Sequence, residues 1–373
     1  MPLPTSGALS LSNIQTEFGG TNPISLNEYY AGGAYVPAGT SGTNGAVPTS
    51  GTISILNFYG TQSVILKGYW GGGTTTTNAT VVSAEIDGIQ FSNETAINPS
   101  ATLVIARHSL GAVNSSTKGY FVGGLTTTTT YPYYNTAANE IDGILFSNES
   151  SINPSSTLPR IPRGVHGSLN SSTKGYFATD TTYPSTVVDG LTFSNDTTTT
   201  TAVNLSARVS SAGVNSSTKG YWGGGRRDVT PEHVTEIDGI LFSNETYINP
   251  SAGLAVGRYH LGGVNSTTRG YFAGGLQRRT SAASQAAAAA EIDGIRFDTE
   301  AAINPAATLP VPRYYSHGTN STTRGYFAGG SISSSIMNEI DGIQFDTEAA
   351  INPAATLAVA RRSLAGMQNG GIL

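Results

Sequence analysis

The sequence predicts an all-β fold built from repeated small sheets, and three observations lead to this prediction. The chain has 46 Gly and 17 Pro among 373 residues, but only 12% charged residues, a balance typical of many turns and few salt-bridged helices. A hydrophobic fraction of 38% that includes 18 Tyr and 12 Phe is enough to bury a core of short strands. The third observation is an internal repeat that covers most of the chain.

The repeat is marked by a Gly-Tyr-aromatic triplet that begins at Gly68, Gly119, Gly175, Gly220, Gly270 and Gly325. A segment of the form EIDGIxF follows each triplet, with the variant VVDGLTF in the third unit. Next come a polar turn such as SNETAINP and an apolar stretch that ends at a repeated arginine: Arg107, Arg163, Arg208, Arg258, Arg313 or Arg361. Four strand-sized pieces per unit, separated by turn residues, predict a β-propeller.

The EIDGIxF segment has two interpretations. Its partly alternating apolar residues favour a strand, and the turn at Ser92 to Thr95 then supplies the chain reversal. The alternative makes Asp-Gly a two-residue hairpin turn.

The unit resembles the kelch repeat over about residues 64 to 368. In that family an aromatic strand ends in Gly-Gly, a later strand ends in Tyr-Asp before a polar turn, and an apolar stretch leads to Arg. Here Tyr120 to Gly124, Phe297-Asp298 and Leu309 to Arg313 match these elements. The sequence departs from the family at Ile303 and its equivalents, where kelch repeats have a bulky aromatic residue, and at Ala178 to Asp180, where the third unit lacks Gly-Gly.

The position of the repeat boundaries predicts six blades. The first unit lacks the strand that should follow an arginine, and the segment Arg361 to Met367 is such a strand without successors. We therefore expect the C-terminal strand to complete the first blade and close the ring, since an open ring would expose sheet edges. The predicted domains are an arm over residues 1–62 and a six-bladed propeller over residues 63–373.

Residues 1–62 contain a short internal repeat, a sequence echo formed by PTSGALSLSNI from Pro4 and PTSGTISILNF from Pro48. The segment between them is rich in Gly, Ala and Thr, and such a short, polar chain is not expected to form its own core. We therefore predict an extended arm that becomes ordered against partners. Its apolar and aromatic residues are the candidate attachment residues: Ile14, Phe18, Tyr29, Tyr30, Phe58 and Tyr59.

This arm resembles the leader on structural proteins of tailed phages of marine bacteria, cyanophages especially. The stretches Ser10 to Gly20 and Asn22 to Gly33 carry most of the resemblance. It implies a component of the virion, present in many copies, in which the arm docks to other virion proteins and the propeller is displayed.

Composition excludes several other classes. With no Cys, the chain has no disulfide, no zinc–thiolate site and no thiol nucleophile. A net charge of −5 without a basic block argues against nucleic-acid binding. No apolar run is long enough to span a bilayer, and the N-terminus does not resemble a standard signal peptide. No catalytic fingerprint, cofactor motif or metal motif occurs, so we expect neither enzymatic activity nor a cofactor.

The repeated polar residues each have two interpretations. The repeated Asp of the IDG segments could line a channel and bind cations, but turn or bulge chemistry is the favoured interpretation. The repeated Arg could form a positive ring around the axis, whereas the kelch resemblance implies a structural Arg that binds carbonyls of a neighbouring blade. Four of the five histidines follow a repeated Arg, but at different offsets, so we do not expect them to form a ring of metal ligands.

The segments that vary between units lie between Gly-Gly and the IDG strand, and the topology places them on one face. Loops on a rigid ring are common binding sites. The candidate residues there are Tyr131, Tyr133, Tyr134, Arg226, Arg227, Arg278 and Arg279. Aromatic rings beside Thr and Arg suit a sugar face or a protein epitope. The alternative is that these loops are tolerated insertions.

Together these features predict a non-enzymatic virion structural protein, part of a tail, neck, capsid fibre or decoration. Its propeller either binds a host-surface glycan or receptor or only decorates the particle. The alternatives are a carbohydrate-active enzyme or a kelch-type protein-binding adaptor on the same scaffold.

Overall fold

The computed structural model describes residues 3–36, 40–61, 66–127, 135–161, 164–179, 185–227, 229, 232–277 and 287–370. The chain divides into two compact units, Met1–Ile65 and Leu66–Leu373. This boundary lies three residues after the predicted one. No helix in the described ranges is long and apolar enough to span a bilayer.

The first unit is not an extended arm, and that prediction was wrong. It contains a helix α1 (Leu11–Phe18), two short 3-10 helices η1 (Leu26–Glu28) and η2 (Ile55–Phe58), and the paired strands β1 (Ser41–Gly42) and β2 (Gly45–Ala46). Its own apolar cluster is formed by eight buried residues: Leu3, Ile14, Phe18, Tyr29, Ala31, Val36, Val47 and Phe58.

The sequence echo explains why so polar a segment folds. In both copies a Ser caps the following helical turn together with the Asn three residues later, Ser10 with Asn13 and Ser54 with Asn57. Such capping boxes satisfy backbone groups that a short helix leaves open. The two ends of the unit are also joined, because Leu3 N donates to Thr61 O at 2.7 Å. Caps and backbone bonds therefore compensate for the small core.

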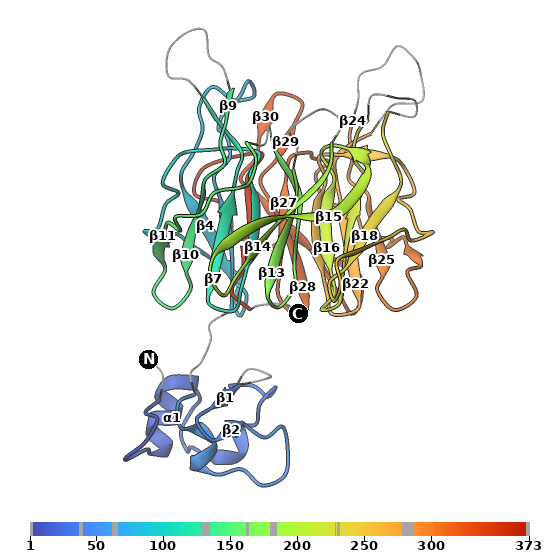
Figure 1. Ribbon diagram of the computed structural model, residues 1–373. Helices are drawn as coiled ribbons and strands as arrows, with labels where there is room; N and C mark the ends of the chain where they lie inside the picture. The colour runs from blue at the N-terminus through green and yellow to red at the C-terminus, as the bar shows by residue number, and fades with distance from the viewer. Residues whose placement is uncertain are drawn as a thin grey trace. The chain divides into compact units, whose positions relative to one another are not determined.

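The larger unit is all-β and consists, in its described residues, mainly of four-stranded antiparallel sheets (Figure 1). Sheet 1 has the order β33 (Ala365–Gln368), β3 (Lys67–Gly71), β4 (Ile86–Gln90), β5 (Thr95–Ile97). Sheet 2 has the order β6 (Gly111–Asn114), β7 (Lys118–Val122), β10 (Ile141–Leu145), β11 (Ser150–Ile152). Sheet 3 has the order β12 (Val165–Asn170), β13 (Lys174–Thr179), β14 (Ser185–Thr192), β15 (Thr197–Arg208).

The other three sheets follow the same pattern. Sheet 4 has the order β16 (Ala212–Asn215), β17 (Lys219–Gly223), β18 (Ile237–Leu241), β19 (Thr246–Ile248). Sheet 5 has the order β21 (Gly262–Asn265), β22 (Arg269–Ala273), β25 (Ile292–Arg296), β26 (Ala302–Ile303). Sheet 6 has the order β27 (His317–Asn320), β28 (Arg324–Ala328), β31 (Ile340–Gln344), β32 (Ala350–Ile351).

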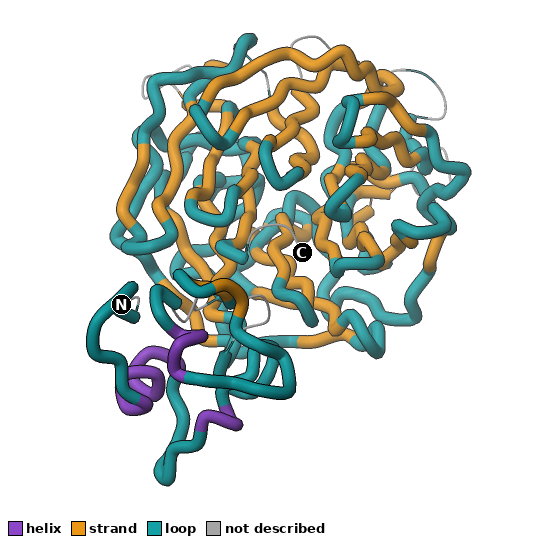
Figure 2. Tube along the Cα trace, turned by 60° about the horizontal axis from the view of Figure 1, so that its bottom comes forward, coloured by secondary structure: helices purple, strands orange, loops and turns teal. Residues whose placement is uncertain are grey.

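The first-named strand of each sheet contacts its counterpart in the next sheet. These contacts run from β6 through β12, β16, β21 and β27 to β33, and β33 contacts β6. Figure 2 shows the strands of this unit gathered around a common centre. In sheet 1 the chain's end supplies the innermost strand, because β33 pairs with β3 along Gly68 to Gly71. The fold is therefore propeller-like.

Shorter hairpins extend the sheets at one end. They are formed by β8 (Leu125–Thr127) with β9 (Asn135–Ala137), by β20 (Arg258–Tyr259) with β23 (Leu276–Gln277) and β24 (Ala287–Ala288), and by β29 (Ser331–Ile332) with β30 (Ser335–Ile336). In Figure 1 the labels β9, β24, β29 and β30 all lie at the same end of the larger unit.

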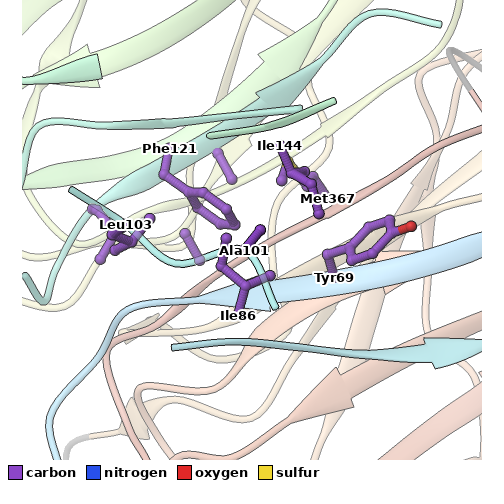
Figure 3. Packing of buried hydrophobic residues seen from close by; sticks show 10 residues of the cluster. Tyr69, Ile86, Ala101, Leu103, Phe121, Ile144 and Met367 are labelled. Atoms are coloured by element: carbon purple, nitrogen blue, oxygen red, sulfur yellow. The ribbon is translucent and has the colours of Figure 1, made fainter. Parts of the chain in front are cut away.

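Apolar side chains fill the spaces between neighbouring sheets. In the cluster of Figure 3, Tyr69 and Ile86 of sheet 1 pack with Phe121 and Ile144 of sheet 2. Burying one such side chain stabilises a protein by about 1.5–3 kcal/mol. The sheets approach so closely that a Cβ added to Gly175 would lie 2.5 Å from Val113 of the preceding sheet. The Gly that opens each aromatic triplet is thus required by packing.

The EIDGIxF segments are strands, as predicted, and the hairpin-turn alternative is wrong. Asp87 lies in the middle of β4, directly opposite Trp70 of β3. The chain reverses after this strand, where Glu94 has a positive φ of 55°. Sheet 3, whose sequence lacks Gly-Gly, is the irregular one, because β15 is 12 residues long and the β14–β15 register shifts.

Candidate functional site

The repeated Arg and Asp residues form buried ion pairs. Arg107 Nη2 lies 2.8 Å from Asp142 Oδ1, and both side chains are almost fully buried. The equivalent pairs are Arg208–Asp238, Arg258–Asp293, Arg313–Asp341 and Arg361–Asp87. Arg163 lies outside the described residues, and in its sheet Arg160 approaches Asp189 at 3.6 Å.

These pairs decide between the two interpretations of each residue. Arg361 Nη1 also donates to the carbonyls of Gly72 and Glu85, at 2.7 and 2.8 Å. The structural interpretation of the Arg is therefore confirmed, and a positive ring around the axis is wrong because Asp neutralises each described guanidinium. Both interpretations of the Asp are wrong, since Asp87 and its equivalents lie in mid-strand and bind Arg.

Burial makes these pairs costly to break. Desolvation raises the pKa of Asp293 and lowers the pKa of its partner Arg258. Each charge is tolerated in the interior because the other is present.

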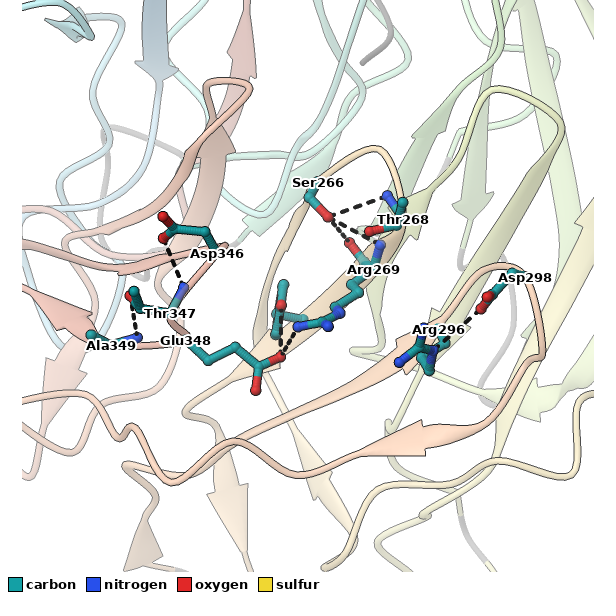
Figure 4. Close-up of polar contacts among 10 residues, drawn as sticks. Ser266, Thr268, Arg269, Arg296, Asp298, Asp346, Thr347, Glu348 and Ala349 are labelled. Atoms are coloured by element: carbon teal, nitrogen blue, oxygen red, sulfur yellow. Dashed lines mark hydrogen bonds and ion pairs between the residues drawn. The ribbon is translucent and has the colours of Figure 1, made fainter.

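A second set of ion pairs joins neighbouring sheets at the end where the innermost strands finish. In each, an acidic residue in the turn after the third strand accepts from a cation and a Tyr of the preceding sheet. Glu348 accepts from Arg269 Nη1 at 2.6 Å and from the Tyr271 hydroxyl at 3.0 Å (Figure 4). The others are Glu94 with Arg324 and Tyr326, Glu149 with Lys67 and Tyr69, Asp196 with Lys118 and Tyr120, Glu245 with Lys174 and Tyr176, and Glu300 with Lys219 and Tyr221.

We call these contacts the clamps. Each clamp Tyr also stacks on a Phe of the next sheet, as Tyr271 does on Phe345 with ring centroids 5.6 Å apart. Burial, with the nearby Glu348, raises the pKa of Tyr271 to about 12, so its hydroxyl keeps its proton and can donate. The clamps repeat with little change in every sheet, which marks this end as structural.

The opposite end of the innermost strands forms the mouth, defined as the residues two positions after each repeated Arg: Ser109, Val165, Ser210, His260, Tyr315 and Ser363. Five of them have φ between 54° and 62°. Their backbones are joined from sheet to sheet, for example by Tyr315 N donating to His260 O at 3.0 Å and Ser363 N donating to Tyr315 O at 2.9 Å. The mouth is therefore held by a belt of backbone hydrogen bonds, and its side chains are free to vary.

A hollow opens within the mouth, with an empty volume of about 530 Å³ that includes space open to solvent. Its polar lining includes Ser210, Ser211, Ser316, His260, Tyr315 and His317. None of the described residues that line it is Asp, Glu, Lys or Arg.

A second, more polar hollow lies further along the axis and is lined by Asn114, Asn170, Asn215, Asn265, Asn320 and Gln368. Four of these Asn side chains accept a backbone N–H from the preceding sheet, as Asn170 Oδ1 does from Asn114 N at 2.9 Å. His317 lines both hollows, at a position where the other sheets have Gly or Ala.

Aromatic rings run outward from one side of the mouth. The centroids of Tyr315 and His260 are 3.8 Å apart, those of His260 and Tyr259 are 4.6 Å apart, and His233 follows Tyr259 at 4.8 Å. Guanidinium groups lie over two of these rings, with Arg362 5.1 Å from the Tyr315 ring and Arg226 5.9 Å from the Tyr259 ring. We call this set the aromatic row.

The structure describes only two of the predicted loop residues. Arg226 forms an ion pair with Glu232 and belongs to the aromatic row, and Arg227 pairs with Glu236 at 2.8 Å. Tyr131, Tyr133, Tyr134, Arg278 and Arg279 lie outside the described residues. The described parts of the variable segments do lie beside the mouth, because Arg226 bridges Val209 and Thr74 bridges Arg362.

Four of the six candidate attachment residues have a different role from the predicted one. Ile14, Phe18, Tyr29 and Phe58 are buried in the cluster of the first unit, so these side chains stabilise that unit and present no surface. Tyr30 and Tyr59 are partly exposed, and their hydroxyls donate to the carbonyls of Gly51 and Gly7.

The described residues contain no cluster of three or more His, Asp or Glu that could hold a metal ion. His260 and His317 both line the hollow, but from different offsets after their Arg. Burial lowers the pKa of His317, whose Nδ1 accepts the N–H of Gly366 at 3.0 Å.

Sequence analysis missed the aromatic row, although a signal was present. At the second position after the Arg, three units have Ser, whereas the fifth and sixth have His260 and Tyr315. Alignment of the units on their Arg residues would have revealed these two exceptions. It would not have revealed that they touch, because that depends on the geometry of the ring.

Comparison with known proteins bears on the fold alone. No family model matches the chain, and no curated protein sequence matches it. Solved structures do match, among them one described as "Structure of YjhT", with a TM-score of 0.60 and 11% identity over 75% of this chain and 95% of that chain. At this identity the likeness supports a shared propeller-like fold and says nothing about activity.

Proposed function

We propose that this chain is a non-enzymatic structural protein of a phage virion. Its first unit docks to other virion proteins, and its second unit is a six-bladed, kelch-like propeller whose mouth faces outward and binds the host surface. The observation that carries the proposal is the division into two units with separate cores, the first of which has the sequence that resembles a phage leader. Such a division suits a protein that is anchored by one part and displays the other.

The six blades correspond to the six sheets, with the first completed by β33. The circuit of contacts between innermost strands and the clamp between Arg324 and Glu94, which joins sheet 6 to sheet 1, both support a closed ring. Closure removes sheet edges that would otherwise pair with other chains.

The chemistry of the mouth favours binding over catalysis. Glycoside hydrolysis normally requires two carboxylates about 5–10 Å apart that flank the bond, and no carboxylate is among the described residues that line the hollow. Aromatic and Arg side chains are instead typical of recognition surfaces. Many copies on one particle would multiply weak single contacts.

Mass spectrometry of purified phage particles tests this proposal. We expect peptides of this chain at many copies per particle, and we expect added purified chain to reduce adsorption of the particles to host cells. Absence of the chain from particles would contradict the virion role. Presence without any effect on adsorption at saturating concentration would contradict host binding by the mouth.

A further inference from the structure

The hollow at the mouth has two chemically different walls. Sheets 1, 2 and 4 supply serines, namely Ser363, Ser109 and Ser210, whereas sheets 5 and 6 supply the rings of His260 and Tyr315. The ring of Tyr315 is fixed between Arg362 and His260. A pyranose sugar has the same division, with hydroxyl groups around its edge and apolar C–H groups on its faces.

One side chain that lines the hollow has a hydroxyl to which a ligand could form a hydrogen bond. Ser316 is 3% exposed, and its hydroxyl forms no hydrogen bond with the part of the chain that the structure describes. Three other sheets place a buried leucine at this position, Leu110, Leu261 and Leu364. A serine here leaves both space and an unsatisfied hydroxyl, and buried polar groups are normally hydrogen-bonded. We therefore expect a polar group of a ligand to lie beside this hydroxyl.

The hollow is suited to an uncharged ligand. Its described lining contains no acidic side chain, Lys or Arg. Burial lowers the pKa of His317, and its Nδ1 accepts the N–H of Gly366, so both favour the neutral ring. A charged ligand buried here would meet no charged side chain in the described lining. The hollow is open to solvent on one side, so it suits the end group of a chain.

From these observations we infer that the hollow binds an uncharged pyranose, the terminal residue of a host-surface glycan. The apolar face of the sugar packs against the edges of the His260 and Tyr315 rings that line the hollow, and its hydroxyls bond to Ser316 and the neighbouring serines. This inference rests on the proposed function, because only a displayed propeller meets such glycans.

The test uses the purified full-length chain and methyl glycosides of neutral hexoses and N-acetylhexosamines, with methyl uronides as charged counterparts. Saturation-transfer NMR detects binding and titration calorimetry gives the affinity. We expect at least one neutral glycoside to bind, and the uronides to bind at least about tenfold more weakly.

Three variants localise the binding. His260→Ser and Tyr315→Ser introduce the residue that three other sheets have at this position, with φ of 54° to 60° against 59° and 62° here, so the backbone should tolerate them. Each should weaken binding about tenfold or more. Ser316→Ala removes only the unpartnered hydroxyl and should weaken binding about fivefold.

Tyr247→Ala is the matched control. Tyr247 is 41% exposed on the outermost strand of sheet 4, where the equivalent residue of sheet 1 is Ala96. It removes an exposed aromatic residue away from the mouth, together with its 2.9 Å hydrogen bond to Asp238. Asp238 keeps its ion pair with Arg208, so binding should be unchanged.

The inference would be overturned if no neutral glycoside binds at about 10 mM, if uronides bind as well or better, or if binding survives both aromatic substitutions. Failure of the proposed function is seen separately. If the chain binds sugar but is absent from particles, the sugar site is upheld and the virion role is rejected. If the chain is present in particles but binds no sugar, the virion role is upheld and the sugar site is rejected.

Discussion

The two ends of the larger unit are built on opposite plans. At the clamp end, six sheets repeat one arrangement of a cation, a Tyr and an acidic turn residue, with only Lys exchanged for Arg and Glu for Asp. At the mouth the backbone repeats, but the side chains are Ser, Val, His and Tyr. The comparison teaches that regular side chains hold the sheets together, whereas variable side chains on a regular backbone are available for recognition.

Removal of residues 361–373 should destabilise the larger unit more than any other change considered below. The deletion removes β33 from sheet 1 together with the Arg361–Asp87 pair, so one sheet loses its innermost strand and an edge is exposed. We expect an insoluble or poorly folded chain, as measured by soluble yield and circular dichroism. Deletion of residues 371–373 alone is the control, and a soluble long truncation with unchanged melting would contradict the closure.

The substitution Arg258→Ala should have the next largest effect. It leaves Asp293 buried without its partner, which typically costs about 3–5 kcal/mol. Arg160→Ala is the matched control, since Arg160 is 34% exposed and lies 3.6 Å from the buried Asp189. Asp189 keeps its hydrogen bonds from Thr179 and Thr200 in this variant, so the substitution should cost less than about 1 kcal/mol. Urea denaturation of both variants gives the comparison, and equal losses would show that burial does not set the strength of these pairs.

A clamp should contribute less to the free energy of unfolding than a buried Arg–Asp pair, and its contribution should depend on pH. The hydrogen bond from Lys219 holds the pKa of Glu300 below its ordinary value. The stabilisation is therefore complete above the unfolded pKa of about 4.3 and is lost as the pH falls through the lower folded pKa. Glu300→Gln should cost about 0.2–1 kcal/mol at pH 7, because both side chains are partly exposed.

The measurement is the difference in melting temperature between the wild type and Glu300→Gln from pH 7 to pH 3. This difference in melting temperature should become smaller below about pH 4, because Glu300 is then increasingly protonated in the wild type. A difference that stays constant over this range would mean that the ion pair is not its source.

We expect the smallest change in stability from Arg227→Ala, a substitution beside the mouth. Its partner Glu236 is 44% exposed, against 27% for Glu300 in a clamp, so the stability change should stay within about 0.5 kcal/mol. Thermal denaturation measures it, and a loss as large as that of a clamp would contradict the division between the two ends.

Much of the larger unit follows from sequence because its signals are local and repeated. The Gly-Tyr-aromatic triplets are second strands, and the IDG segments are third strands. The partner of the repeated Asp was beyond such reasoning, since Arg258 and Asp293 are 35 positions apart and meet only when the sheet has formed. Turn chemistry explained Asp-Gly equally well from sequence alone.

The first unit and the mouth were predicted least well, for different physical reasons. Composition suggested that residues 1–62 could not form a core, but it does not count the capping boxes at Ser10 and Ser54 or the buried ring of Tyr29. At the mouth, His260 and Tyr315 are 55 positions apart and contact only because neighbouring innermost strands start side by side.

The pairing of β3 with β33 also constrains the order in which the chain can mature during synthesis. Trp70 emerges from the ribosome almost three hundred residues before Gly366, its partner across the strand pair. Sheet 1 therefore waits, with an unpaired strand, while every other sheet can complete itself from nearby sequence. Nascent chains are exposed to misassembly in such intervals, so the rate of translation and the presence of chaperones should influence the yield of this protein more than its final stability does.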